Sequence, residues 1–231
     1  MISKKVENIR GRITEACARV GRDPAGVTLV AVTKTFSVDA IRAAVTAGTR
    51  DVGENYVQEL LAKREALQDD SVRWHFVGHL QSNKVRQIVP WISMIHAVDS
   101  GGLVREIDRR AKSTGRVIDC LIEVNTTGEK SKFGIDPRRT HEFVRELEDL
   151  NNVRLAGLMT IGPFLPDPEG SRPMFRLLRE LRDKLATLRQ GNAPMQHLSM
   201  GMSGDFEVGI EEGATLIRIG TAIFGRRIKN T

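Results

Sequence analysis

Thr28-Leu-Val-Ala-Val-Thr-Lys34 carries six residues of strand character directly into a single lysine. Valine, leucine and threonine favour the pleated conformation, and a run this apolar predicts a strand buried on both faces of a parallel sheet. Lysine is almost never fully buried without a reason, and Lys34 would stand at the sheet edge where parallel α/β folds build their sites. Alone, the pattern is more typical of a lysine whose stem covers the core while its amine reaches water.

Strand-like runs of this kind recur along the chain and alternate with helical patterns. We predict strands at residues 28–34, 51–55, 74–77, 94–98, 117–125, 155–161, 196–200 and 216–219. Such alternation implies parallel strands joined by right-handed crossovers. Eight units in 231 residues predict a (β/α)8 TIM barrel, with an extra N-terminal helix over residues 3–20. A doubly wound open sheet is the alternative, and with no linker or repeat we expect residues 1–231 to form one domain.

The composition is that of a globular chain with a sizeable core, with 40% hydrophobic and 28% charged residues. No apolar run approaches the ~18 residues that span a bilayer, and the N-terminus has a charged helical pattern rather than a signal segment. We therefore expect a cytoplasmic protein without a membrane partner.

Cys17 and Cys120 fit as small core residues. The five histidines lack metal-ligand spacing, so we predict no metal site.

The net charge of +6 and the pI near 9.6 raise the possibility of a nucleic-acid partner. However, the cations are interleaved with acidic residues, and the only compact basic cluster is Arg226-Arg227-Ile-Lys229. Aromatic residues, which would stack on bases, make up only 5% of the chain. A solvated surface is the better interpretation. We predict no nucleic-acid partner and a monomeric protein.

Polar residues collect where the predicted strands end. They are Lys34, Asn55, His79, Asn125, the Met159-Thr160 pair, the stretch from Ser199 to Ser203, and Arg218. In a barrel these positions share one rim, which is where the binding sites of this fold lie. Each residue alone fits an ordinary loop position, but their joint occurrence points to a site.

The last two strands indicate a phosphate site. Ser199-Met-Gly-Met-Ser-Gly-Asp205 and Arg218-Ile-Gly-Thr221 place small residues and hydroxyls at turns. Small residues let backbone N–H groups approach an anion, and the loops after strands seven and eight hold phosphate in many barrels. Two tight turns with helix caps are the alternative interpretation.

Arg218 lies inside the apolar run 216–219 and, being always protonated, needs acceptors. These could come from Glu123 in a structural ion pair or from a bound ligand. A lysine amine condenses with carbonyl compounds when its pKa is lowered by desolvation or nearby cations. Lys34, Arg218 and the phosphate loops therefore fit two ligands, a sugar phosphate in an aldolase-like site or pyridoxal 5′-phosphate (PLP).

Seven sequence blocks are spread over almost the whole chain: LVAVTK (29–34), GENYVQE (53–59), HFVGHLQSNK (75–84), SKFG (131–134), GLMT (157–160), LSMGMS (198–203) and IRIGT (217–221). Through these blocks the sequence resembles the pyridoxal phosphate homeostasis proteins. The resemblance implies a fold similar to the alanine racemase barrel domain, with PLP held as a Schiff base on Lys34. It further implies that Arg218 faces the pyridine nitrogen. The implied phosphate ligands are Ser203, Gly220 and Thr221, with Ser199 less certain, and the implied ring contacts are Asn55, His79 and Met200.

Arg218 and the scarcity of tyrosine then argue against an efficient PLP enzyme. PLP enzymes that form carbanions usually need a protonated pyridine nitrogen, whereas a guanidinium only donates and would keep that nitrogen neutral. Racemases tolerate such an arginine but use a second base, for which the one available tyrosine is Tyr56. They also use an additional β domain that the sequence does not show. We therefore expect no efficient catalysis.

The leading hypothesis is a PLP carrier that buffers the intracellular cofactor and delivers it to apo-enzymes. A racemase-like PLP-dependent amino-acid enzyme and a basic nucleic-acid-binding protein are the alternatives. The sequence leaves open which enzymes would receive PLP. It also leaves open whether Lys84, Lys130 or Lys132 offers a second PLP contact.

Overall fold

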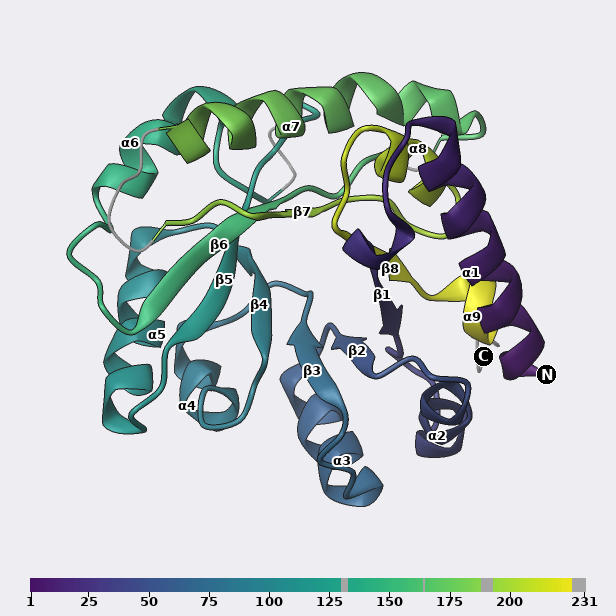
Figure 1. The fold of residues 1–231 in the computed structure, drawn as a ribbon. Helices are drawn as coiled ribbons and strands as arrows, with labels where there is room; N and C mark the ends of the chain where they lie inside the picture. Colours follow the sequence, from purple (N-terminus) through teal and green to yellow (C-terminus); the bar gives the residue numbers. More distant parts are fainter. Residues whose placement is uncertain (130–132, 164, 188–192, 226–231) are drawn as a thin grey trace.

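A closed barrel of parallel strands forms the centre of the protein (Figure 1). The computed structural model describes residues 1–129, 133–163, 165–187 and 193–225. The strands are β1 (Thr28–Val32), β2 (Asp51–Glu54), β3 (Arg73–Phe76), β4 (Met94–Val98), β5 (Ile118–Glu123), β6 (Val153–Met159), β7 (His197–Ser199) and β8 (Leu216–Ile219). Each pairs in parallel with the next, and β8 pairs with β1. The predicted (β/α)8 barrel is confirmed, and the open sheet is excluded.

Helices follow the strands and cover the outside of the barrel (Figure 1). They are α1 (Ile2–Arg19), α2 (Val38–Thr46), α3 (Val57–Leu67), α4 (Val85–Ile88), α5 (Gly101–Ser113), α6 (Thr140–Arg145), α7 (Arg172–Thr187), α8 (Phe206–Glu211) and α9 (Thr221–Phe224). Short 3-10 turns lie at Pro24–Gly26, Ser82–Lys84, Pro137–Arg139 and Pro168–Ser171. The predicted extra helix is α1, which precedes β1 and packs against α2, α8 and α9.

The apolar core has two layers, because successive residues of a strand face opposite sides of the barrel wall. The outer layer lies between strands and helices and includes Cys17 and Cys120, both of which are unpaired thiols. The inner layer is small and consists of Val30, Met94, Ala97, Leu121, Ala156, Met159 and Leu216. In β8, Leu216 belongs to the inner layer, whereas Ile217 and Ile219 belong to the outer one. Arg218 therefore shares the inward side of β8 with Leu216.

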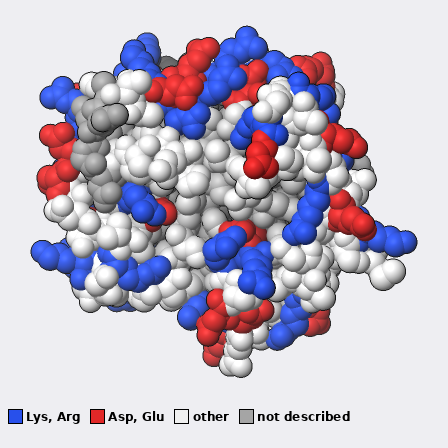
Figure 2. All heavy atoms as spheres, in the orientation of Figure 1, with Lys and Arg blue, Asp and Glu red and all other residues white. Residues whose placement is uncertain are grey.

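The surface carries both signs of charge. On the face shown in Figure 2, Lys and Arg side chains are interspersed with Asp and Glu side chains. The basic cluster at residues 226–229, like Lys130 and Lys132, lies outside the described residues.

Within the described ranges, no helix has the length and apolar character needed to cross a membrane. The same ranges hold no group of three or more His, Cys, Asp or Glu side chains arranged to bind a metal ion.

Candidate functional site

A cavity of about 560 Å³ opens at the carboxyl ends of the strands, as expected for this fold. Apolar side chains make up much of its wall, among them Phe36, Ile161 and Leu165. Six of the nine residues predicted for the site also line it, namely Lys34, Asn55, Ser203, Arg218, Gly220 and Thr221. These residues come from the ends of β1, β2, β7 and β8, so the barrel brings distant parts of the sequence to one place.

Lys34 stands in a turn two residues beyond the end of β1 and is half-buried. The turn is held in an uncommon conformation, because the next residue, Thr35, has a φ of 67°. A β-branched residue rarely adopts this left-handed conformation, and such strain persists only where neighbouring contacts enforce it. One such contact is the hydrogen bond that the Thr35 N–H donates to Glu59 Oε2 at 2.8 Å.

A buried ion cluster lies directly beneath this turn. Lys63 of α3 donates hydrogen bonds to the Thr33 carbonyl (2.7 Å), to Glu54 (2.6 Å) and to Glu59 (2.8 Å). The Thr33 hydroxyl also donates to Glu54, at 2.6 Å. Burial raises the pKa of the Glu54 carboxyl, while Lys63 and Thr33 act against that rise. The cluster ties the turn before Lys34 to β2 and α3.

The loops after β7 and β8 contribute another part of the cavity wall. Gly201 has a φ of 89°, and a Cβ there would lie 2.8 Å from the Cα of Phe206, so only glycine fits this turn. Asp205 then closes the loop by accepting the Met202 N–H at 2.7 Å. The Ser203 hydroxyl accepts the N–H of Ala222 at 3.2 Å and so joins the loop to the first turn of α9. Small residues and hydroxyls thus converge at one end of the cavity.

Arg218 is buried, and its guanidinium is held by neutral oxygen atoms. It donates to the carbonyl of Ser199 (2.7 Å), to the Ser199 hydroxyl (2.6 Å) and to the Thr160 carbonyl (2.8 Å). Burial lowers the pKa of Arg218 to about 10, and Glu123 and Asp205 oppose this shift. Arg218 therefore stays cationic at neutral pH. Burial, together with Asp99, raises the pKa of Glu123 to about 7, against the effect of Arg218.

Asn55 lines the cavity and carries an unsatisfied polar atom. Its Oδ1 is buried and has no hydrogen-bond partner within the described structure. A buried polar group without a partner costs roughly 1–3 kcal/mol, and an amide at a cavity wall can recover that energy from a ligand. The backbone of Asn55 packs closely against Gly78, where a Cβ would lie 2.4 Å from the Asn55 carbonyl oxygen.

The remaining three predicted residues lie outside the cavity lining. Ser199 is fully buried behind Arg218, and the buried side chain of Met200 belongs to the outer core layer. His79 stands at the rim with 43% of its side chain exposed, 3.3 Å from an oxygen of Asp99, and its ring stacks on that of Phe133. Their contact with a ligand stays a prediction.

Sequence reasoning missed the ion cluster around Lys63 and two histidines inside the barrel. His75 and His96 are buried, although they come from the middle of apolar strands. The signal that could have found them is the one that singled out Arg218, a polar residue at an inward position of a buried strand. Metal-ligand spacing alone does not reveal His75 and His96, because it ignores which residues of a strand face inward.

Known proteins with similar sequences and structures give the family. Residues 5–227 match the family described as "Alanine racemase, N-terminal domain". The chain is 46% identical over 224 residues to the pyridoxal phosphate homeostasis protein of Aquifex aeolicus, covering 97% of each chain. A crystal structure of an unknown protein from Bifidobacterium adolescentis matches with a TM-score of 0.91 and 38% identity, covering 96% of this chain and 94% of that one.

A further solved structure contains the cofactor itself. It is PipY of Synechococcus elongatus with PLP bound, which matches with a TM-score of 0.85 and 34% identity. The match covers 97% of this chain and 100% of that chain. With such extensive identity to its relatives, this chain belongs to the family of pyridoxal phosphate homeostasis proteins, which is built on the alanine racemase N-terminal domain.

Proposed function

We propose that this protein binds PLP covalently through Lys34, keeps the reactive aldehyde out of solution, and releases the cofactor to apo-enzymes in the cytoplasm. The observation that carries the proposal is the convergence of Lys34, Arg218 and the Gly220–Thr221 turn on one cavity. PLP, when bound, supplies an aldehyde that condenses with a primary amine and a pyridine ring that withdraws electrons. The Lys34 amine would form a carbon–nitrogen double bond to the aldehyde carbon, with loss of one water.

The residues of the cavity fit the other groups of PLP. Arg218 is a permanent donor and would bind the pyridine nitrogen in its neutral, accepting form. Ser203, Gly220 and Thr221 offer hydroxyls and a small residue at the end where a phosphate would lie. The unsatisfied amide of Asn55 would pair with the ring hydroxyl. The apolar remainder of the wall suits the ring faces and methyl group.

Two features favour a carrier over a racemase-like enzyme. Arg218 would leave the pyridine nitrogen unprotonated and so weaken the electron withdrawal on which carbanion chemistry depends. Racemisation also needs a base on each face of the substrate, and Tyr56, the one tyrosine in the sequence, is 56% exposed and lies outside the cavity lining. The Aquifex aeolicus relative named above likewise carries a homeostasis name rather than an enzyme name.

The proposal is tested by loading the purified protein with PLP, recording its visible absorbance, reducing it with borohydride, and mapping the pyridoxyl adduct by peptide mass analysis. We expect a yellow protein with the adduct on Lys34. A protein that stays colourless with added PLP would contradict covalent binding. Circular dichroism of L-alanine incubated with the loaded protein tests the alternative, because loss of signal at enzyme-like rates would show a racemase.

Ser203→Ala is expected to weaken PLP binding about tenfold, equivalent to ~1.4 kcal/mol, without removing the visible band. The variant lacks the hydroxyl that joins the two phosphate-side loops, whereas the linkage to Lys34 is unaffected. Spectral titration gives the affinity, and titration with pyridoxal, which lacks the phosphate, is the control. Ser203→Ala should leave pyridoxal binding unchanged, and an equal loss for both ligands would argue against a phosphate role.

A further inference from the structure

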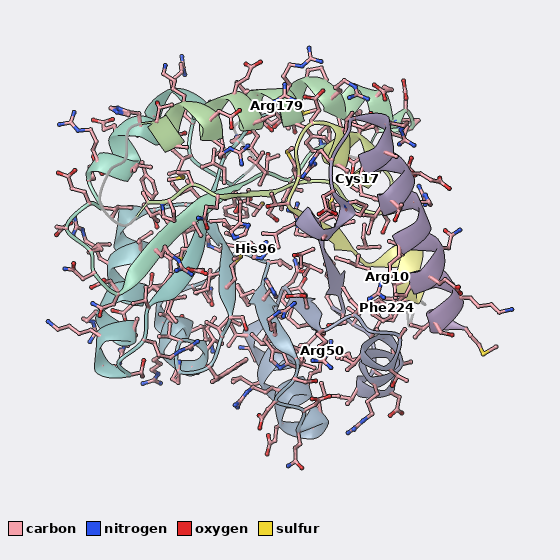
Figure 3. All side chains as sticks on the ribbon, viewed as in Figure 1. Arg10, Cys17, Arg50, His96, Arg179 and Phe224 are labelled. Carbon is pink, nitrogen blue, oxygen red and sulfur yellow. The ribbon has the colours of Figure 1, made fainter. Side chains whose placement is uncertain are left out.

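A chain of hydrogen bonds runs through the interior of the barrel from Asp51 to Arg218. Asp51 Oδ1 lies 2.9 Å from His75 Nε2, and His75 Nδ1 lies 2.9 Å from His96 Nε2. His96 Nδ1 lies 2.9 Å from the Ser199 hydroxyl, which in turn accepts from Arg218 at 2.6 Å. All five side chains are buried. Figure 3 shows His96, the central member, in the middle of the barrel.

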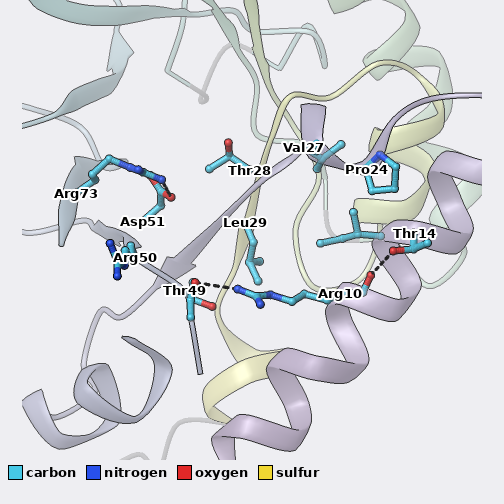
Figure 4. A pocket seen from close by; sticks show the side chains of 13 residues that line it. Arg10, Thr14, Pro24, Val27, Thr28, Leu29, Thr49, Arg50, Asp51 and Arg73 are labelled. Atoms are coloured by element: carbon cyan, nitrogen blue, oxygen red, sulfur yellow. Dashed lines mark hydrogen bonds and ion pairs between the residues drawn. The ribbon is translucent and has the colours of Figure 1, made fainter. Parts of the chain in front are cut away.

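The two ends of this hydrogen-bond chain, Asp51 and Arg218, line different cavities. Arg218 lines the cavity that we assign to PLP. At the opposite end of the barrel, Asp51 lines a second cavity of about 430 Å³, together with Arg73 (Figure 4). Arg73 donates from Nε to Asp51 Oδ1 at 2.8 Å. This contact anchors the carboxylate that ends the chain.

The chemistry of the two ends fixes the direction of the bonds when both imidazoles are neutral. A carboxylate can only accept, so His75 donates to Asp51 through Nε2 and must accept at Nδ1. His96 therefore donates through Nε2 to His75 and accepts at Nδ1 from the Ser199 hydroxyl. That hydroxyl oxygen is left to accept from Arg218, which can only donate. Burial, reinforced by His75 and Arg218, holds the pKa of His96 well below its usual range, in keeping with a neutral ring.

The hydrogen-bond chain affects the orientation of the Arg218 guanidinium in the cavity. A guanidinium has five N–H donors in one rigid plane, and three of them are engaged by Ser199 and Thr160. The two carbonyl contacts come from the backbone, but the hydroxyl contact requires the Ser199 proton to point away from Arg218, and donation of that proton to His96 fixes it in such an orientation. Supporting hydrogen bonds of this kind fix the orientation of a ligand-binding group.

We infer that His96 and His75 are positioning residues, which act through Ser199 to set the orientation of the Arg218 guanidinium toward the pyridine ring of PLP. This inference rests on the proposed function, since it assigns Arg218 to that ring. Neither histidine lines the PLP cavity. Their effect on the cofactor is therefore transmitted along the hydrogen-bond chain.

Two amide variants of His96 separate this role from a general contribution to packing. In His96→Asn the side-chain oxygen takes the place of Nδ1 and can still accept the Ser199 proton. In His96→Gln the longer side chain places its amide near Nε2, which preserves the contact with His75 but leaves Ser199 without its acceptor. We expect His96→Gln to shift the visible band of bound PLP and weaken binding about tenfold, whereas His96→Asn keeps the wild-type spectrum and affinity.

A shift in both variants or in neither would overturn the inference. Thermal unfolding of each variant separates a spectral change from loss of the fold. If the His96 variants do not fold, Ser199→Ala removes only the hydroxyl and should give the same band shift, and an unchanged band there would overturn the inference. Failure of the wild-type protein to bind PLP would instead count against the proposed function.

A second readout needs no cofactor. In the PLP-free protein at neutral pH, long-range ¹H–¹⁵N correlation spectra report which ring nitrogen of each histidine carries the proton. We expect His96 to carry its proton on Nε2 and none on Nδ1, and Ser199→Ala to leave the spectrum of His75 unchanged. A proton on Nδ1 of His96 in the wild-type protein would reverse the chain and contradict the inference.

Discussion

Lys34→Ala is expected to abolish the visible absorbance of the PLP-loaded protein and to weaken PLP binding by about 100-fold, equivalent to ~2.7 kcal/mol. The variant removes the amine that we propose to bond to the aldehyde, so only the other residues of the cavity, Arg218, Asn55 and the loops after β7 and β8, remain to hold the ligand. Spectral and calorimetric titrations measure the two effects independently. Borohydride reduction should then leave no pyridoxyl group on the protein.

Two variants control for charge and for non-specific labelling. Lys34→Arg keeps the positive charge but forms no stable double bond to the aldehyde, so it should also lose the visible band. Lys112→Ala changes an exposed lysine of α5 and should behave like the wild-type protein. An unchanged band and affinity in Lys34→Ala would disprove the covalent linkage at this residue, although phosphate anchoring could still hold.

Lys63→Met is expected to lower the free energy of unfolding by about 3–5 kcal/mol, because it leaves a buried carboxylate without its partner. The side chain of Lys63 is only 10% exposed and that of Glu54 is fully buried. Urea unfolding measures the loss. The loss should shrink as the pH falls toward the raised pKa of Glu54, since a protonated carboxyl carries no charge to be compensated.

The matched control removes both partners. Lys63→Met combined with Glu54→Gln should recover much of the stability, because a buried charge is no longer left alone. Both variants should still bind PLP more weakly than the wild type, since Lys63 also holds the Thr33 carbonyl one residue before Lys34. A loss of less than about 1 kcal/mol in Lys63→Met would mean that the pair behaves as an exposed ion pair.

The strands of this barrel are largely predictable because most of them are short apolar runs bounded by polar turns. Residues 94–98 and 216–219 form strands with the predicted bounds. The strand predicted over 117–125 is shorter, Ile118–Glu123, because pairing with β4 and β6 decides where the ladder ends. The helical segment after β5 begins with a 3-10 turn at Pro137–Arg139 and becomes α-helical only at Thr140.

The site was less predictable, because contacts between distant elements shape it. Motifs identified Lys34 and Arg218, and the structure brings both to one cavity. The ion cluster around Lys63 is different, since α3 reads as an ordinary charged helix and nothing in its pattern shows that Lys63 is buried. The alternate facing of successive residues, inward and then outward, also separates Ser199 from Met200. They are adjacent in sequence, but Ser199 bonds to Arg218 in the barrel interior while Met200 packs in the outer core layer.

The pairing of β1 with β8 has a consequence for the synthesis of the protein. A chain leaves the ribosome from its N-terminus at roughly 5–20 residues per second, so Lys34 emerges well before Arg218. The barrel cannot close, and the cavity between these residues cannot exist, until β8 has been translated. A nascent or truncated chain therefore exposes Lys34 without the rest of the pocket. Only a finished chain can hold the cofactor tightly, which makes PLP retention a direct report of completed folding.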